Sequence, residues 1–163
     1  VIALDITGEK ALKAAIASYA TTATAYQRYR NKNIELNGSD ADEKILAEKL
    51  PEYFAKHLNK DCIAFVARDE DTIAAVALLI IIEKPCSPKF INGLVGEVLS
   101  VYTRPKYRHQ GLCSNLMKLL IDCAREKGLN KIELKATDDG YPVYKKVGFA
   151  DAGGEYKAMV YKF

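Results

Sequence analysis

The sequence predicts a mixed α/β fold in which a largely antiparallel central sheet is covered by helices on both faces. Three observations support this prediction. Apolar residues recur at helical spacing over residues 9–29, the period changes to that of strands over residues 62–103, and both periods alternate over residues 112–163. Strands followed by alternating helices and strands are typical of one sheet with helices packed against it.

Size and composition predict one folded domain, residues 1–163. The length is usual for a single domain, and 49% hydrophobic with 28% charged residues is enough for a packed core. The longest apolar run, residues 73–82, is too short to cross a bilayer, and no charged and then apolar leader opens the sequence. The cysteines form no Cys-x-x-Cys pair, so we expect reduced thiols without a bound metal, in a cytoplasmic protein without membrane contact.

The first 60 residues predict a short strand and a pair of helices. Turn formers separate the two helices, and Ser39 or Asp40 is expected to cap the second one. Pro51 is expected to bend or divide this second helix, because proline has no N–H group to donate. The predicted elements are a strand at residues 1–6 and helices at residues 9–29 and 40–58.

Residues 62–103 predict three antiparallel strands. A polar turn at residues 69–71 joins the first two strands, and the second strand is apolar on both faces, as expected in a sheet covered on both sides. Gly96 is expected to interrupt the third strand near its start. The strands are predicted at residues 62–67, 72–82 and 94–103.

The last third predicts two helices that alternate with two strands. An apolar stripe indicates a helix that begins near Leu112 and ends at Gly128. Asp138 or Asp139 is expected to cap a shorter helix that ends at Gly148. The two strands are predicted at residues 131–136 and 157–163.

A basic loop before the longer of these helices predicts an anion-binding site. Residues 101–163 hold 12 basic and 7 acidic side chains, whereas residues 1–100 hold 12 and 14. A helix start leaves backbone N–H groups unpaired and carries a partial positive charge, so a phosphate gains several donors there. Gly111 would let a ligand approach the backbone, Arg108 would bind two phosphate oxygens, and Ser114 adds a hydroxyl group.

Alternatives for this loop are a solvated basic surface without a ligand and a glycine that serves the turn alone. ATP, GTP and NAD are poorly supported, because the Gly-Lys-Ser/Thr ending of a P-loop and the three glycines of the dinucleotide fingerprint are absent. Nucleic acid is not expected as a partner, because no motif that reads it is present.

Two motifs resemble those of the GNAT superfamily of N-acetyltransferases. Arg108-x-x-Gly111-x-Cys113 is similar to the family's nucleotide signature Arg/Gln-x-x-Gly-x-Gly/Ala, with cysteine in place of the last small residue. Residues 144–149, Tyr-Lys-Lys-Val-Gly-Phe, are similar to the Tyr-x-Lys-x-Gly-Phe ending of the family's late helix. The resemblance covers residues 61–163, and before them only the helix pair agrees.

The resemblance implies acetyl-coenzyme A as cosubstrate, with residues 61–163 as its binding core and the helix pair of residues 1–60 on the acceptor side. Its diphosphate is expected on the loop's backbone N–H groups, from residue 108 onward. Its pantetheine arm would pair with the edge of the third strand. The residues expected to bind it are Val101, Tyr102, Thr103, Arg108, His109, Gln110, Gly111, Leu112, Cys113 and Ser114.

Two residues are candidates for the proton transfers. Glu97 is the candidate base, because at a period of two it would share the face of Val101 and Thr103, and the resemblance to histone-acetylating family members points to the same residue. Tyr144 corresponds to the family's usual general acid, which protonates the leaving thiolate. The alternatives are a solvated or ion-paired Glu97 and a Tyr144 that only packs in the core.

The expected activity is transfer of an acetyl group from acetyl-coenzyme A to a primary amine. Direct attack in a ternary complex is expected, because no cysteine has a histidine and an acid at the spacing of a nucleophile. The acceptor amine of a small metabolite, a peptide N-terminus or a protein lysine would fit, and the sequence is compatible with a homodimer. The alternative is a non-catalytic acyl-coenzyme A sensor of the same fold.

Overall fold

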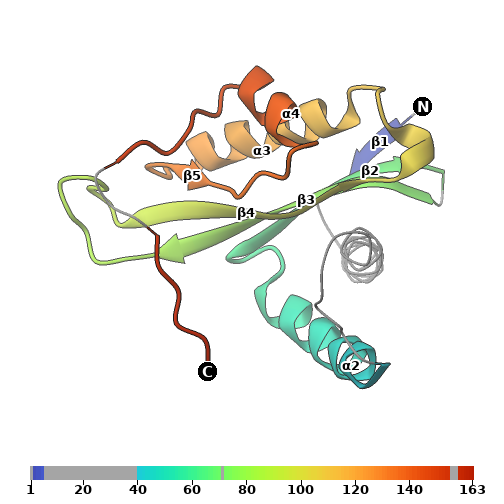
Figure 1. Ribbon diagram of the computed structural model, residues 1–163, viewed down its shortest axis with the longest axis horizontal. Coiled ribbons are helices and arrows are strands. Elements are labelled where there is room, and N and C mark those ends of the chain that lie inside the picture. Colours follow the sequence, from blue (N-terminus) through green and yellow to red (C-terminus); the bar gives the residue numbers. More distant parts are fainter. Residues whose placement is uncertain (1, 6–39, 71, 155–157) are drawn as a thin grey trace.

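The computed structural model describes residues 2–5, 40–70, 72–154 and 158–163. Its centre is a five-stranded sheet in the order β1-β2-β3-β4-β5 (Figure 1). β1 to β4 are antiparallel to their neighbours, and β5 runs parallel to β4. The strands are β1 (Ile2–Asp5), β2 (Cys62–Asp69), β3 (Thr72–Glu83), β4 (Leu94–Thr103) and β5 (Ile132–Glu133). The helices are α2 (Asp40–His57), α3 (Leu112–Glu126) and α4 (Tyr141–Lys146), with the 3-10 helix η1 (Pro105–Tyr107).

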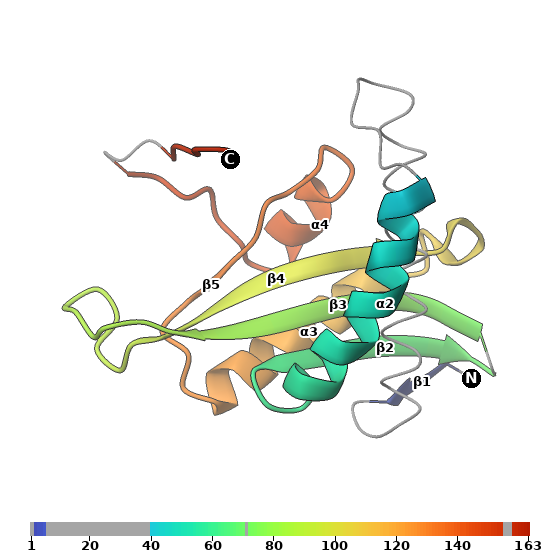
Figure 2. The ribbon, with the colours of Figure 1, turned by 90° about the horizontal axis from the view of Figure 1, so that it is seen from below.

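Helices cover both faces of this sheet. α3 and α4 lie on one face, and α2 lies on the other, where it crosses the strands in the view of Figure 2. β3 is buried on both faces, because Leu79 packs in the core under α3 while Leu78 packs with Phe54 of α2. The predicted mixed, largely antiparallel sheet with helices on both faces is therefore confirmed.

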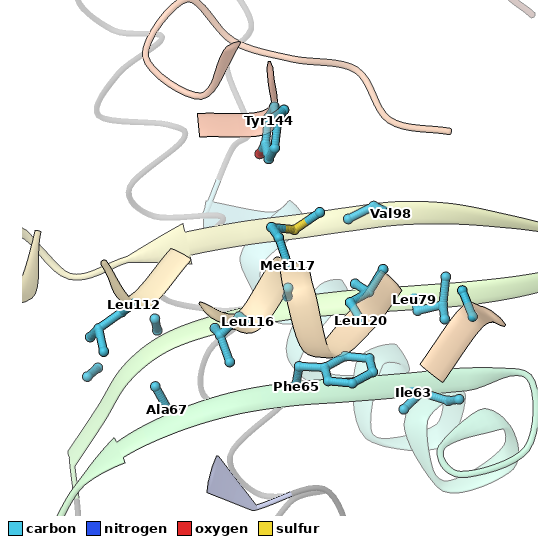
Figure 3. Close-up of a cluster of buried hydrophobic side chains, with 14 of the residues drawn as sticks. Ile63, Phe65, Ala67, Leu79, Val98, Leu112, Leu116, Met117, Leu120 and Tyr144 are labelled. Carbon is cyan, nitrogen blue, oxygen red and sulfur yellow. The ribbon is translucent and has the colours of Figure 1, made fainter. Parts of the chain in front are cut away.

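The core on the α3 face explains the apolar stripe in the sequence. Leu112, Leu116 and Leu120 of α3 are buried and share one cluster with Phe65 of β2 and Leu79 of β3 (Figure 3). Each fully buried leucine side chain contributes about 1.5 to 3 kcal/mol relative to an exposed one. This packing fixes the start of α3 against the sheet.

Gly96 does not interrupt β4 as expected, but allows β5 to approach it closely. Its N–H group donates to the Lys131 carbonyl oxygen at 2.9 Å. A Cβ atom on Gly96 would lie 2.7 to 2.8 Å from side-chain atoms of Ile132, Leu129 and Leu79. β5 pairs with β4 at two residue pairs, and beyond them no described strand pairs with this edge of β4.

The predicted final strand is wrong over the part that the structure describes. Residues 158–163 form no strand, and Met159 and Tyr161 are 95% and 81% exposed. Their sequence has strand propensity, but a strand forms only where another strand offers its edge. Residue 157 lies outside the described residues. The strand predicted at residues 131–136 is limited to the two residues of β5 that meet β4.

The predicted cap of the short helix is also wrong. α4 has Gly140 as its cap residue, and the Gly140 N–H group donates to Thr137 Oγ1 at 3.2 Å. The same N–H group lies 3.1 Å from the Thr137 carbonyl oxygen, which closes a turn. Asp138 and Asp139 lie inside this turn, three and two residues before the first residue of α4, and neither side chain caps the helix.

Of the two helices predicted before β2, the structure describes the second. Pro51 lies inside α2, which continues through it undivided to His57. The helix predicted at residues 9–29 lies outside the described residues, and the cap predicted at Ser39 or Asp40 falls on side chains that the structure does not describe. In the described part of the chain, no helix has the length and apolar character needed to cross a membrane.

Candidate functional site

A cavity of about 870 Å³ lies between the end of β4, the start of α3 and α4. It joins residues 101–114 to residues 137–146, which are separate in the sequence. Nine of the ten residues predicted to bind the cosubstrate line it, whereas Gln110 does not. The nine are Val101, Tyr102, Thr103, Arg108, His109, Gly111, Leu112, Cys113 and Ser114.

The start of α3 presents backbone donors without partners to this cavity. The Asn115 N–H group donates to the Gly111 carbonyl oxygen at 3.0 Å, which begins the helical pattern. Among the described residues, no carbonyl oxygen accepts a hydrogen bond from the N–H groups of residues 110–114. Gly111 has a φ of +78°, and a Cβ atom there would meet nothing within 4 Å, so the space at this turn is open. Such a helix start suits an anion.

Arg108 is held so that its terminal nitrogens stay available. Its Nε atom donates to the Thr103 carbonyl oxygen at 3.0 Å. Within the described ranges, no group accepts from its two terminal nitrogens, which can bind two phosphate oxygens. Its backbone N–H group donates to the Pro105 carbonyl oxygen at 3.2 Å. Contrary to expectation, the row of available N–H groups therefore does not begin at residue 108.

A bulge in β4 separates Glu97 from the cavity. The pairing of β3 with β4 skips a residue near Ser100, which has a φ of +53°. The extra residue reverses the alternation of side chains beyond it. Glu97 pairs with Ile80, which packs on the α2 face, whereas Val101 packs on the α3 face. The expectation that Glu97 shares the face of Val101 and Thr103 is therefore wrong, and Glu97 does not line the cavity.

Tyr144 is a buried phenol in the cavity wall. Its side chain extends from α4 toward the sheet (Figure 3), and it meets the Phe149 ring edge to face at 6.1 Å. The ring lies over Gly140, where a Cβ atom would be 2.8 Å from Tyr144 Cε2. Burial, and after it the Cys113 thiol, raise the pKa of Tyr144 to about 12. The hydroxyl group therefore keeps its proton from neutral pH well into the alkaline range and can donate it.

Apart from Tyr144, the cavity wall at residues 137–146 was not predicted from the sequence, and Tyr107 was missed in the other wall. Two features of the sequence could have indicated these residues: Tyr107 belongs to the basic loop, and an Asp-Asp-Gly turn at residues 138–140 precedes the short helix. Nothing in the linear sequence shows that the turn faces the loop. The lining residues that were missed are Tyr107, Thr137, Asp139, Gly140, Pro142, Val143 and Lys146.

Comparison with known protein sequences points to one family. The model of the acetyltransferase (GNAT) family matches residues 25–149. A glucosamine 6-phosphate N-acetyltransferase from Trypanosoma brucei brucei is 38% identical over 64 residues. That stretch covers 38% of this chain and 44% of the trypanosomal protein, so the match spans less than half of that enzyme.

Solved structures with the same fold extend over nearly the whole chain. A predicted acetyltransferase from Clostridium acetobutylicum, solved with acetyl-CoA, has a TM-score of 0.76 and 25% identity, and the match covers 98% of this chain and 96% of that one. A GCN5-related N-acetyltransferase from Ralstonia eutropha JMP134 has a TM-score of 0.74 and 19% identity over 98% and 99%. Because the family match includes β4, α3 and α4, which form the cavity, as well as most of the chain, the chain belongs to the acetyltransferase (GNAT) family.

Proposed function

We propose that the protein transfers an acetyl group from acetyl-coenzyme A to a primary amine by direct attack in a ternary complex. The observation that carries this proposal is the cavity, which joins a row of unpaired backbone donors to a buried, neutral phenol. The donors suit a diphosphate, and the phenol suits a leaving thiolate that needs a proton. A sequence of the GNAT family with this cavity supports the same cosubstrate.

Residues of the loop and of β4 would hold the cosubstrate. The N–H groups of residues 111–114 and the Arg108 guanidinium would bind the diphosphate. The edge of β4 beyond Glu97, which no described strand covers, would pair with the two amides of the pantetheine arm at residues 101–103. When bound, the cosubstrate supplies an acetyl group activated as a thioester.

Tyr144 would supply the proton that the leaving sulfur needs. As the new carbon–nitrogen bond forms and the carbon–sulfur bond breaks, the hydroxyl proton passes to sulfur, and solvent returns a proton to the phenol. Burial raises the pKa of the Cys113 thiol, so this cysteine stays protonated and is a poor nucleophile. This favours direct attack over an acyl-enzyme.

Glu97 remains the proposed base, now acting from the α2 face. It is half-buried there and does not reach the cavity, so a water molecule would carry the amine proton to its carboxylate. This placement agrees with an acceptor that approaches from the face of the sheet on which α2 lies. The acceptor and cosubstrate would then meet at β4 from its two faces.

Thiol release from acetyl-coenzyme A in the presence of a panel of amines tests the proposal. Glucosamine 6-phosphate heads the panel because the trypanosomal relative is named for it, followed by small metabolite amines, peptide N-termini and lysine peptides. We expect amine-dependent thiol release and a matching acetylated product by mass spectrometry. Coenzyme A binding without release for any amine would support the acyl-coenzyme A sensor instead, and no binding would contradict both functions.

A further inference from the structure

A hydrogen bond links the cofactor loop, which we define as residues 104–111, to β2. The Tyr107 hydroxyl group donates to Asp69 Oδ2 at 2.7 Å. Tyr107 is 7% exposed and belongs to the core under α3, while Asp69 is half-buried at the end of β2. Hydrogen bonds to an ionised carboxylate are shorter and stronger than those between neutral groups. This hydrogen bond therefore connects two segments that are 38 residues apart in the sequence.

The other described hydrogen bonds of the cofactor loop reach β3, β4 or the first turn of α3, or stay within the loop. The Arg104 N–H group and Nε atom donate to the carbonyl oxygens of Ala74 and Ile73 at 2.9 and 2.7 Å. Arg108 donates back to the end of β4. Tyr107 is thus the loop residue that reaches β2, and it does so at the point where the chain turns toward α3.

This hydrogen bond adjoins the proposed diphosphate site. Tyr107 lines the cavity, and its neighbour in the chain is Arg108. His109, which directly follows Arg108, has a φ of +61°, a left-handed conformation that a non-glycine residue keeps only when its surroundings hold it. A site with several convergent donors binds its ligand well only when they are held close to the productive geometry. A cofactor loop released from β2 would lose that geometry.

We propose that Asp69 is a positioning residue, which acts through Tyr107 to hold the donors of the cofactor loop in the arrangement that binds the diphosphate of coenzyme A. This inference rests on the proposed function and adds to it a residue of β2 that does not line the cavity. Asp69 and Tyr107 take no part in the transfer of the acetyl group. Their effect is on the affinity for coenzyme A.

Calorimetric titration with coenzyme A tests this pair. We expect Tyr107→Phe and Asp69→Ala each to weaken binding about tenfold, because a loop held by one hydrogen bond fewer spends more time out of the binding geometry. The double variant should bind no worse than either single variant, since both changes remove the same bond. Asp69→Asn keeps an acceptor oxygen and should lose less affinity than Asp69→Ala.

Tyr141→Phe is the matched control. It also removes a hydroxyl group that donates to an aspartate, Asp151, at 2.9 Å, but this bond is exposed and Tyr141 does not line the cavity. Its affinity for coenzyme A should equal that of the wild type. Each titration is run at a temperature well below the midpoint of thermal unfolding of the variant, so that a loss of stability alone does not change the measured affinity.

Three results would overturn the role of the pair. They are wild-type affinity in the folded single variants, additive losses in the double variant, and a Tyr141→Phe loss as large as that of Tyr107→Phe. A wild-type protein that fails to bind coenzyme A would instead remove the proposed function, and the positioning role with it. The two failures are therefore distinguishable.

Discussion

Burial extends the pH range over which the Tyr144 hydroxyl group stays protonated. Burial raises its pKa from the ordinary value of 10.0 to about 12. A phenol with the ordinary value would ionise in the range where primary amines lose their protons, and it would then fail as a donor. Tyr144 keeps its proton through that range, as an acid for a leaving thiolate requires.

Replacement of Tyr144 by phenylalanine should separate turnover from binding. The variant keeps the ring that packs with Phe149 and loses only the hydroxyl group. We expect kcat to fall about 100-fold, a usual effect of removing a general acid. The affinity for coenzyme A, measured by calorimetry, should not change. Undiminished turnover would eliminate the acid role and leave Tyr144 as a residue of the core.

Cys62 should make the stability of the protein depend on pH in the alkaline range. Burial, and after it the Asp61 carboxylate, raise the pKa of this thiol from 9.0 to about 11. Below pH 9 the thiol is protonated in both the folded and the unfolded state. Between pH 9 and pH 11 the unfolded state loses the proton first, so the free energy of unfolding falls as the pH rises, by at most about 1.4 kcal/mol per unit.

Urea unfolding of Cys62→Ala across this range measures the contribution. The variant loses stability at every pH because it leaves a cavity in the core, but its free energy of unfolding should fall less steeply than that of the wild type above pH 9. Cys86→Ala changes an exposed cysteine and should keep the wild-type slope. If the free energy of unfolding falls equally steeply with pH in all three proteins, the raised pKa of Cys62 is contradicted.

At the scale of the element, the loop before α3 depends on the left-handed backbone at Gly111. Gly111 and Gly148 have φ values of +78° and +106°, and a Cβ atom on either would meet nothing within 4 Å. Alanine at each position should therefore destabilise the fold by about 1 to 2 kcal/mol through backbone strain alone. The two glycines differ in location: Gly111 lines the cavity, and Gly148 does not.

This difference provides a matched pair of variants. Gly111→Ala should weaken coenzyme A binding, because its Cβ atom enters the space beside the unpaired N–H groups. Gly148→Ala should keep the wild-type affinity while losing similar stability in urea. Equal affinities of the two variants, measured by calorimetry, would place the diphosphate elsewhere.

Helices and strands with regularly spaced apolar residues could be predicted from the sequence. Features that depend on pairing with another strand could not. The stripe of α3 and the strands β2, β3 and β4 follow from residue spacing. The bulge at Ser100 has no such signal, since serine is common in strands and loops alike, and it alone moves Glu97 off the face of Val101. Strand-like residues at 158–163 form no strand, because propensity does not supply a neighbouring edge.

At the scale of the whole molecule, the sequence showed one wall of the cavity and the topology supplied the other. The loop and the start of α3 could be predicted because their chemistry lies in one short stretch. In the wall at residues 137–146 only Tyr144 was identified, through the family resemblance, because this wall faces the loop only after α3 and β5 have packed. The same holds for the bond from Tyr107 to Asp69. Contacts between distant segments depend on the fold.

Calorimetric titration of the wild type, Arg108→Ala and Arg125→Ala with coenzyme A tests the central claim most directly. Arg125 is an exposed arginine of α3 that pairs with Asp122 and does not line the cavity. We expect the wild type and Arg125→Ala to bind alike, and Arg108→Ala to bind at least about tenfold more weakly, because it loses a bidentate contact with the diphosphate. No heat of binding for the wild type, or equal affinities for all three proteins, would contradict the account.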